Sequence, residues 1–297
     1  MTAHPPTVIE AALNGMTTSD ANPNVPRSVD EIVESGFACL AAGASIIHHH
    51  NDEPLFGGPT RHATEPYVAV WRRLRERHPR LVLHPTMAGA TPTSTVEERF
   101  AHIVDLYDTG LEPVATCDAG ILALAFPAGD GGPPMTRPDT FGNSAAEVDW
   151  ILRWCREREV SVHISIFEPG MLRLVLAHHA AGTLPQAKIQ LYLGGDRMLF
   201  GLPSTPRSLD AYLAMLEGTG LPWMVAVYGG DVTAAGLAAL AIERGGHVRV
   251  GLEDHHAPPS TPRNEELVAE VRELADAGGR RPAQPDEVRQ ILWGDGD

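Results

Sequence analysis

The stretch Ile46-Ile47-His48-His49-His50-Asn51-Asp52 decides how this sequence is interpreted. The apolar residues 44–47 predict a buried strand that ends at three consecutive histidines. Side chains alternate along a strand, so His48 and His50 should point to one face and His49 to the other. Two neutral imidazoles on one face can bind a single metal ion. The alternative is structural, because the chain has 14 histidines and most will be ordinary surface or core residues.

Strands and helical patterns alternate along the rest of the chain. Eight strands are predicted, at residues 8–13, 44–47, 81–83, 113–116, 160–167, 189–193, 223–227 and 248–250. A helical pattern follows each strand, and such alternation implies a parallel sheet. Eight units in 297 residues favour an α/β fold of the (β/α)₈ TIM barrel type, with a doubly wound open sheet as the second possibility.

The sequence shows no change in composition that would mark a domain boundary. We therefore expect residues 1–297 to form a single barrel domain, with a C-terminal helical extension over about residues 279–297. The predicted last helix, at residues 286–292, is apolar enough to pack on a neighbouring subunit. Residues 130–138 are rich in glycine and proline and are predicted to be a loop.

Composition limits the kinds of partner. The net charge of −15 argues against binding to nucleic acid or to an anionic membrane surface. No apolar run approaches the ~20 residues of a membrane span, and the start of the chain does not resemble a signal peptide. The three cysteines form no CxxC pair, which fits a reducing compartment. These features predict a cytoplasmic protein.

In TIM barrels the functional residues follow the strand C-termini. The polar residues at those positions are Asn14, His48, His50, Asp52, His84, Thr86, Thr116, Asp118, Glu168, Asp196, Tyr228, Asp231, Arg249, Glu253 and Asp254. A zinc site with two histidines commonly recruits one carboxylate and keeps the fourth position open, and Glu253 could close such a set. Arg249 lies on a buried strand and needs a partner, for which Asp254 is the candidate. From local sequence alone, Glu253-Asp254 could equally be a solvated acidic pair.

The chain resembles the β-keto acid cleavage enzymes, the family that includes 3-keto-5-aminohexanoate cleavage enzyme. The matching pieces are Asn22-Pro23 with Val25-Pro26, the run Ala42 to His48 with His50, Phe167 to Met171, and Gly245 to Asp254. The resemblance extends over nearly the whole length. It implies a TIM barrel with one divalent metal ion, usually zinc (Zn²⁺), held by His48, His50 and Glu253.

The resemblance also implies a reaction and the residues that perform it. A β-keto acid and acetyl-CoA would become acetoacetate and a new acyl-CoA, in a retro-Claisen type of exchange. Substrate contacts fall on Thr86, Gly89, Thr116 and Asp118. The catalytic acid or base falls on Asp254, assisted by Arg249, which would orient Asp254 and lower its pKa. Barrels of this family tend to be homotetramers.

The departures from the family pattern include Met16, Asp118 and His49. Met16 aligns with the glutamate that recognises the amine of 3-keto-5-aminohexanoate, and a methionine cannot pair with an ammonium group. Asp118 replaces an asparagine, which adds a negative charge and could favour a cationic or hydroxylated substrate. His49 replaces an apolar residue, and we expect it to face the helix layer as a structural histidine.

Two other functions remain open from the sequence. The first is a metal-dependent barrel hydrolase that activates water on an amide or ester. Such barrels usually carry the His-x-His pair on their first strand with further histidines on middle strands, whereas this pair is on the second. The other is a catalytically silent binding protein that retains the barrel.

Overall fold

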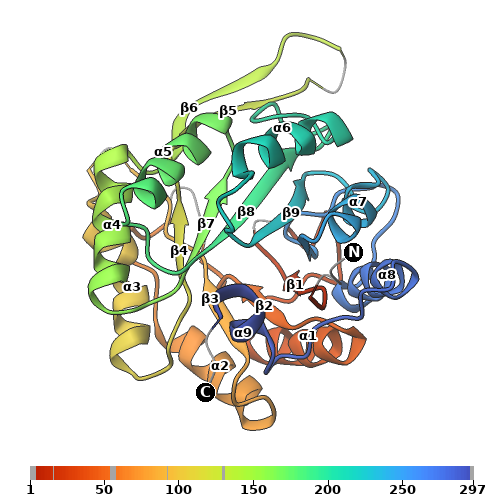
Figure 1. Cartoon of the computed structure of the whole chain (residues 1–297), viewed down its shortest axis with the longest axis horizontal. Helices are drawn as coiled ribbons and strands as arrows, with labels where there is room; N and C mark the ends of the chain where they lie inside the picture. The colour runs from red at the N-terminus through yellow and green to blue at the C-terminus, as the bar shows by residue number, and fades with distance from the viewer. Residues whose placement is uncertain (1–4, 16, 54–57, 92, 129–130, 295–297) are drawn as a thin grey trace.

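Eight parallel strands, each followed by a helix, form the TIM barrel that the alternation predicts (Figure 1). The computed structural model describes residues 5–15, 17–53, 58–91, 93–128 and 131–294, so the predicted departure at Met16 lies outside the described residues. The barrel strands are β1 (Ile9–Ala12), β2 (Ile46–His49), β3 (Val82–Pro85), β4 (Ala115–Asp118), β7 (Val162–Ile166), β8 (Ala187–Gly194), β9 (Trp223–Tyr228) and β10 (His247–Val250). The helices are α1 (Val29–Ala42), α2 (Glu65–Arg77), α3 (Val96–Asp108), α4 (Ala145–Glu157), α5 (Pro169–Ala180), α6 (Pro206–Leu216), α7 (Leu237–Glu243), α8 (Asn264–Ala277) and α9 (Val288–Trp293).

The strand order brings the two ends of the chain's barrel region together. Along the sheet the order is β3-β2-β1-β10-β9-β8-β7-β4, so β1 lies between β2 and β10. The pairing of Ala12 with His48, and of Ala11 with Val250, places the carboxyl ends of these three strands side by side. The barrel is nearly closed: β3 and β4 end the ladder, and the Val114 amide donates to the Leu83 carbonyl over 3.1 Å.

Capping boxes start several of the helices. The Ser28 hydroxyl accepts from the Glu31 amide while the Glu31 carboxylate accepts from the Ser28 amide. Thr95 and Glu98 form the same reciprocal pair at the start of α3. Each pair satisfies amides that have no partner within the helix, so the chain turns sharply from loop to helix.

A hairpin that the sequence did not predict follows β4. Strands β5 (Ile121–Phe126) and β6 (Met135–Gly142) pair antiparallel and project beyond the barrel strands (Figure 1). The predicted loop at residues 130–138 is therefore wrong in part, because β6 begins at Met135. The glycines and prolines before Met135 mark only the turn, and the strand after them is too irregular in its polarity to be recognised from alternation.

The last helix closes the amino-terminal end of the barrel. Val288 and Leu292 of α9 pack with Val8, Ile46 and Val82 in a separate apolar cluster. Val288 and Leu292 are thus buried against the helix's own barrel, and the expectation that the helix also packs on a neighbouring subunit stays a prediction. The predicted division into one domain with a C-terminal extension stays a prediction. Among the described residues, no helix is long and apolar enough to cross a membrane.

Candidate metal-binding site at the barrel mouth

A cavity of about 430 Å³ opens at the carboxyl ends of the barrel strands. The predicted site residues that line it are His48, His50, Thr86, Thr116, Asp118, Arg249, Glu253 and Asp254. Gly89 is buried in the loop after β3 and is not one of the described residues that line the cavity, so its predicted contact with substrate stays a prediction. Eight of the nine residues that the family resemblance assigns to the site therefore line one cavity.

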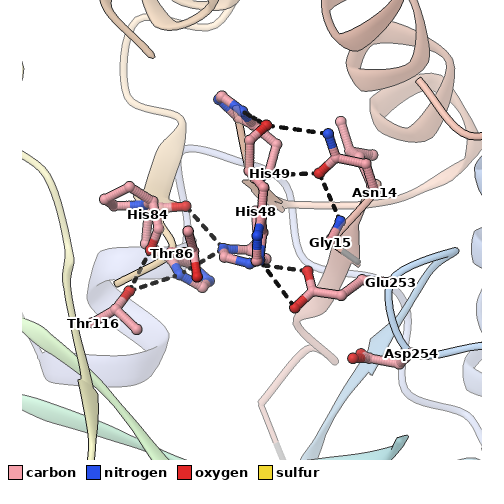
Figure 2. A network of polar contacts seen from close by, with 12 residues as sticks. Asn14, Gly15, His48, His49, His84, Thr86, Thr116, Glu253 and Asp254 are labelled. Carbon is pink, nitrogen blue, oxygen red and sulfur yellow. Dashed lines mark hydrogen bonds and ion pairs between the residues drawn. The ribbon is translucent and has the colours of Figure 1, made fainter. Parts of the chain in front are cut away.

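Two imidazoles and one carboxylate converge at the bottom of this cavity. His48 Nε2 lies 3.0 Å from Glu253 Oε2, and His50 Nε2 lies 3.3 Å from Glu253 Oε1. One nitrogen or oxygen atom of each residue lies within 4.8 Å of the others, a spacing that one ion can bridge. Figure 2 shows His48 and Glu253 pointing toward each other from opposite sides of the site. All three side chains are at least nine-tenths buried.

The nitrogen and oxygen atoms of His48, His50 and Glu253 are arranged as the ligands of a cation would be. His48 Nδ1 lies 3.0 Å from the His84 carbonyl oxygen, which can only accept, so Nδ1 carries the proton and Nε2 presents a lone pair. That lone pair faces the Glu253 carboxylate. His50 Nε2 and Glu253 Oε2 are buried and make no hydrogen bond within the described part of the chain. Ligands of a tetrahedral zinc ion lie about 3.3 Å apart, close to these separations.

Asn14 and Gly15, in the loop after β1, position the candidate ligands. The Asn14 side chain accepts from the His50 amide over 2.8 Å and donates to the His50 carbonyl over 3.1 Å, which fixes the chain beyond β2. Gly15 has a φ of +50°, and a Cβ built there would lie 2.2 Å from Glu253 Cγ. The glycine therefore leaves the space that the Glu253 side chain occupies.

Arg249 organises the acidic side of the cavity. Its Nε and Nη2 atoms bind Asp254 over 2.8 and 3.2 Å, as predicted, and Nη2 also lies 2.8 Å from Glu253 Oε1. Its Nη1 atom donates to Glu10 Oε1 over 3.0 Å, a partner that the sequence did not indicate. The guanidinium lies over the Tyr192 ring at 5.4 Å. Its orientation is therefore fixed by three acids and one aromatic ring.

A second layer of buried polar residues lies next to these ligands in the barrel interior. Glu10 Oε1 accepts from His84 Nε2 over 3.0 Å, and Glu10 Oε2 forms an ion pair with Lys188. With its proton on Nε2, His84 presents a lone pair on Nδ1, which lies 3.1 Å from His48 Nδ1. The His84 ring also stacks between His48 and His163, with centroids at 4.3 and 4.4 Å. The network connects the Glu10 carboxylate to the candidate ligand His48 through the imidazole of His84.

Glu10, His84 and His163 also lie close enough together to hold an ion. Their chemistry fits one poorly, because the Lys188 ammonium already pairs with Glu10. A second cation at that place would meet a buried positive charge. The set formed by His48, His50 and Glu253 is therefore the better candidate.

Burial and charge together set the protonation of these groups. Burial lowers the pKa of His48 to about 3, which keeps the imidazole in the neutral form that binds metals. Burial alone would raise the pKa of Glu253, but Arg249 and the two imidazoles outweigh it and hold that pKa well below its usual range. For Asp254 burial wins over Arg249 and raises the pKa to about 6. The expected lowering is thus wrong in its net direction.

His49 points away from the cavity, as predicted. It is fully buried, its Nε2 accepts from the Trp71 indole over 3.0 Å, and its ring lies 4.9 Å from the Tyr67 ring. Both aromatic residues belong to α2. The second of the three histidines therefore joins strand to helix and takes no part in the cavity.

Comparison with known proteins finds relatives of this chain over nearly its whole length. The family model for beta-keto acid cleavage enzymes matches residues 6–293. The 3-keto-5-aminohexanoate cleavage enzyme of Fusobacterium nucleatum is 32% identical over 290 residues, which are 96% of this chain and 97% of that protein. The 3-oxoadipate:acetyl-CoA acetyltransferase of Cupriavidus necator is 27% identical, over 97% of this chain and 94% of that protein.

A solved structure supports the fold. The apo structure of ObcA superimposes with a TM-score of 0.64 at 16% identity, over 91% of this chain and 65% of that one. Identity this low establishes the barrel architecture and carries nothing about the reaction.

Proposed function

The chain belongs to the β-keto acid cleavage enzyme family, an enzyme family of β-keto acid cleavage and acyl-CoA transfer, and we propose the following reaction for it. A β-keto acid and acetyl-CoA are converted into acetoacetate and a new acyl-CoA. In the exchange the bond between C2 and C3 of the keto acid breaks, and C2 forms a bond to the acetyl carbon. The sulfur of CoA passes from the acetyl group to the released acyl group. The convergence of His48, His50 and Glu253 in one cavity supports this proposal best.

The proposed metal ligands are His48, His50 and Glu253, and the proposed metal is zinc. Two neutral imidazoles and one carboxylate are a common ligand set for catalytic zinc. When bound, the ion would supply a Lewis acid for a carbonyl oxygen of the keto acid. The orphaned Nε2 of His50 and Oε2 of Glu253 are the observations that favour a cation at this place.

Asp254 is the proposed acid or base, and Arg249 its positioning residue. The Asp254 carboxylate is 4% exposed and lines the cavity beside Glu253. It can accept the proton from C2, which is acidic because the C3 keto group is adjacent to it. The bidentate contact with Arg249 fixes the direction in which the carboxylate points, so its reach into the cavity is defined before substrate arrives.

Thr86, Thr116 and Asp118 are the proposed substrate contacts, together with Gly89. Thr86 directly follows β3 and Thr116 lies within β4, and both line the cavity together with the histidines. Acetyl-CoA would enter from the outer rim, where Arg197 and His256 line the cavity and lie 3.3 Å apart. Cationic and imidazole groups at a rim suit the phosphates of CoA.

Metal analysis and product analysis test the proposal together. The purified enzyme should contain about one zinc ion per chain, and His48→Ala should lose it while His179→Ala, on the outer helix α5, should keep it. Incubation with acetyl-CoA and a panel of β-keto acids should yield acetoacetate and acyl-CoA. Equal metal in the wild type and His48→Ala would refute the ligand assignment.

The same assay distinguishes the alternative function. Hydrolysis of amides or esters in water, with no requirement for acetyl-CoA, would indicate the metal-dependent barrel hydrolase instead. We also propose a homotetramer in the cytoplasm, by likeness to the family. Light scattering of the purified enzyme would test the assembly state, and a monomer would refute it.

A further inference from the structure

The β5–β6 hairpin turns one apolar face toward the cavity. Leu122, Leu124 and Phe126 alternate along β5 and all line the cavity, whereas Ile121, on the opposite face of the strand, is 54% exposed. Phe141 on β6 pairs with Leu122 and also lines the cavity. The period of two explains this division, because successive side chains of a strand face opposite sides.

Aromatic residues from the barrel continue this apolar surface. The ring of Phe167, at the end of β7, contacts those of Phe141 and Phe200 edge-on, with centroids at 5.9 and 5.3 Å. It also stacks on Tyr192 at 4.6 Å. Met198 lines the cavity from the loop that carries Phe200. We call this surface, from the hairpin to the loop after β8, the apolar wall.

Charged groups gather on the other side of the cavity. Glu253, Asp254 and Arg249 come from β10 and the turn after it, beside the histidines of β2, and they bind one another. In the strand order β10 and β2 flank β1. Strands β8, β7 and β4, which the hairpin follows, come after β9 in that order and so lie across the barrel from β1. The cavity therefore has a polar side for chemistry and an apolar side for the rest of a substrate.

From this division we infer that the β-keto acid carries an uncharged, apolar chain of several carbons beyond its keto group. This inference rests on the proposed function. With the keto acid group at the histidines, the remaining chain lies against the apolar wall. An ammonium or second carboxylate at the end of that chain would lose its water there without gaining a partner.

Two charged residues on the lining must be weighed against this inference. Asp118, at the end of β4, could pair with an ammonium group, but it belongs to a barrel strand, whereas the described hairpin residues that line the cavity are all apolar. Arg197 could pair with a second carboxylate, but it lies at the exposed rim beside His256. The wall between them offers four apolar side chains from the hairpin alone. An apolar chain is therefore the better match.

Three keto acids of similar length test the substrate class. 3-Oxo-5-methylhexanoate is apolar beyond the keto group, 3-keto-5-aminohexanoate carries an ammonium group, and 3-oxoadipate carries a second carboxylate. We expect kcat/KM, measured with saturating acetyl-CoA, to be at least about tenfold higher for the apolar acid. Calorimetric binding of each acid without acetyl-CoA should show the same order.

A substitution on the hairpin tests the wall itself. Leu124→Lys should lower kcat/KM for the apolar acid at least about tenfold and raise the relative value for 3-oxoadipate. Ile121→Lys is the matched control, since it adds the same charge to the outer face of the same strand, and it should leave both values unchanged. If Leu124→Lys does not fold, Leu124→Ala should instead shift the preference toward longer apolar acids.

The outcomes separate this inference from the proposed function. If no keto acid yields acetoacetate, the proposed function fails. If acetoacetate forms but a charged acid has the higher kcat/KM, the function stands and the inference is overturned. Equal values for the three acids, or equal effects of Leu124→Lys and Ile121→Lys, would also overturn it.

Discussion

Glu10 is the residue on which the two buried layers of the barrel depend. It is fully buried, and its two oxygens contact His84, Arg249 and Lys188. Burial would raise its pKa, but Lys188 and His84 outweigh burial and hold that pKa well below its usual range. Glu10 therefore stays charged, and its carboxylate stabilises the tautomer of His84 that carries the proton on Nε2.

Replacing this carboxylate should weaken metal binding. In Glu10→Gln a neutral acceptor faces His84, so the tautomer and the orientation of His48 are less firmly fixed. We expect the dissociation constant for zinc to rise roughly tenfold, the low end of the range for such outer partners. Competition with a chelating dye would measure it, with circular dichroism to verify folding. An unchanged constant would mean that the His84 carbonyl alone orients His48.

Arg249 should not tolerate the substitution that preserves its charge. A lysine has one ammonium group, which cannot bind Asp254 in a bidentate manner and reach Glu10 as well. We expect Arg249→Lys to lower kcat about 100-fold through misplacement of Asp254, with zinc still bound.

The control for that variant is Arg280→Lys. Arg280 is also buried but donates to the backbone carbonyls of Ile242 and Gly246, outside the cavity. Steady-state rates and metal content would be measured for both variants. Similar losses of kcat in the two would point to general destabilisation rather than to the position of Asp254.

At the scale of elements, the sequence predicts the strands that end in polar residues. It does not predict the polar contacts made by charged residues within a strand. The pair His48 and His50 was found because a strand of apolar residues leads into it. Glu10 and Lys188 were missed because each is a single charge within a strand, and their partnership spans 178 residues. The β5–β6 hairpin was missed because glycine and proline in its turn resemble a longer loop.

The turn after β1 offers a prediction at this scale. Gly15→Ala would place a Cβ within 2.2 Å of Glu253 Cγ, so the carboxylate must move away from the histidines. We expect zinc affinity to fall at least about tenfold. Gly182→Ala is the control, because Gly182 has a similar positive φ and no neighbour within 4 Å of such a Cβ. Equal zinc affinity in the two variants would contradict the assigned role of this close approach.

In the whole molecule, the candidate site and the cluster packed under α9 lie at opposite ends of the barrel. The cavity lies at the carboxyl ends of the strands, and α9 covers the opposite end with Val288 and Leu292. Figure 1 shows α9 lying across the barrel, in front of β2 and β3. Substitutions in α9 should therefore change the free energy of unfolding and leave the catalytic constants alone.

Leu292→Ala tests this separation. The side chain is 5% exposed and packs in the cluster that contains Ile46 and Val82, so its loss leaves a cavity. We expect the free energy of unfolding to fall by about 2–5 kcal/mol in urea titrations, with kcat and KM unchanged. Gln290→Ala, exposed on the same helix, should have little effect. A change in KM for the keto acid would show that the two ends of the barrel communicate.

The separate position of the β5–β6 hairpin affects how related enzymes can differ in sequence. It lies between two barrel repeats and forms a sheet of its own, so its strands can vary in length and residue type without disturbing the pairing of the barrel strands. The histidines and acids, by contrast, lie on or directly after β2 and β10, and a shift of either strand would also shift the strands paired with it. Diversity among relatives should therefore accumulate in this appendage, and grafting it between homologues would exchange their preferences while leaving the reaction intact.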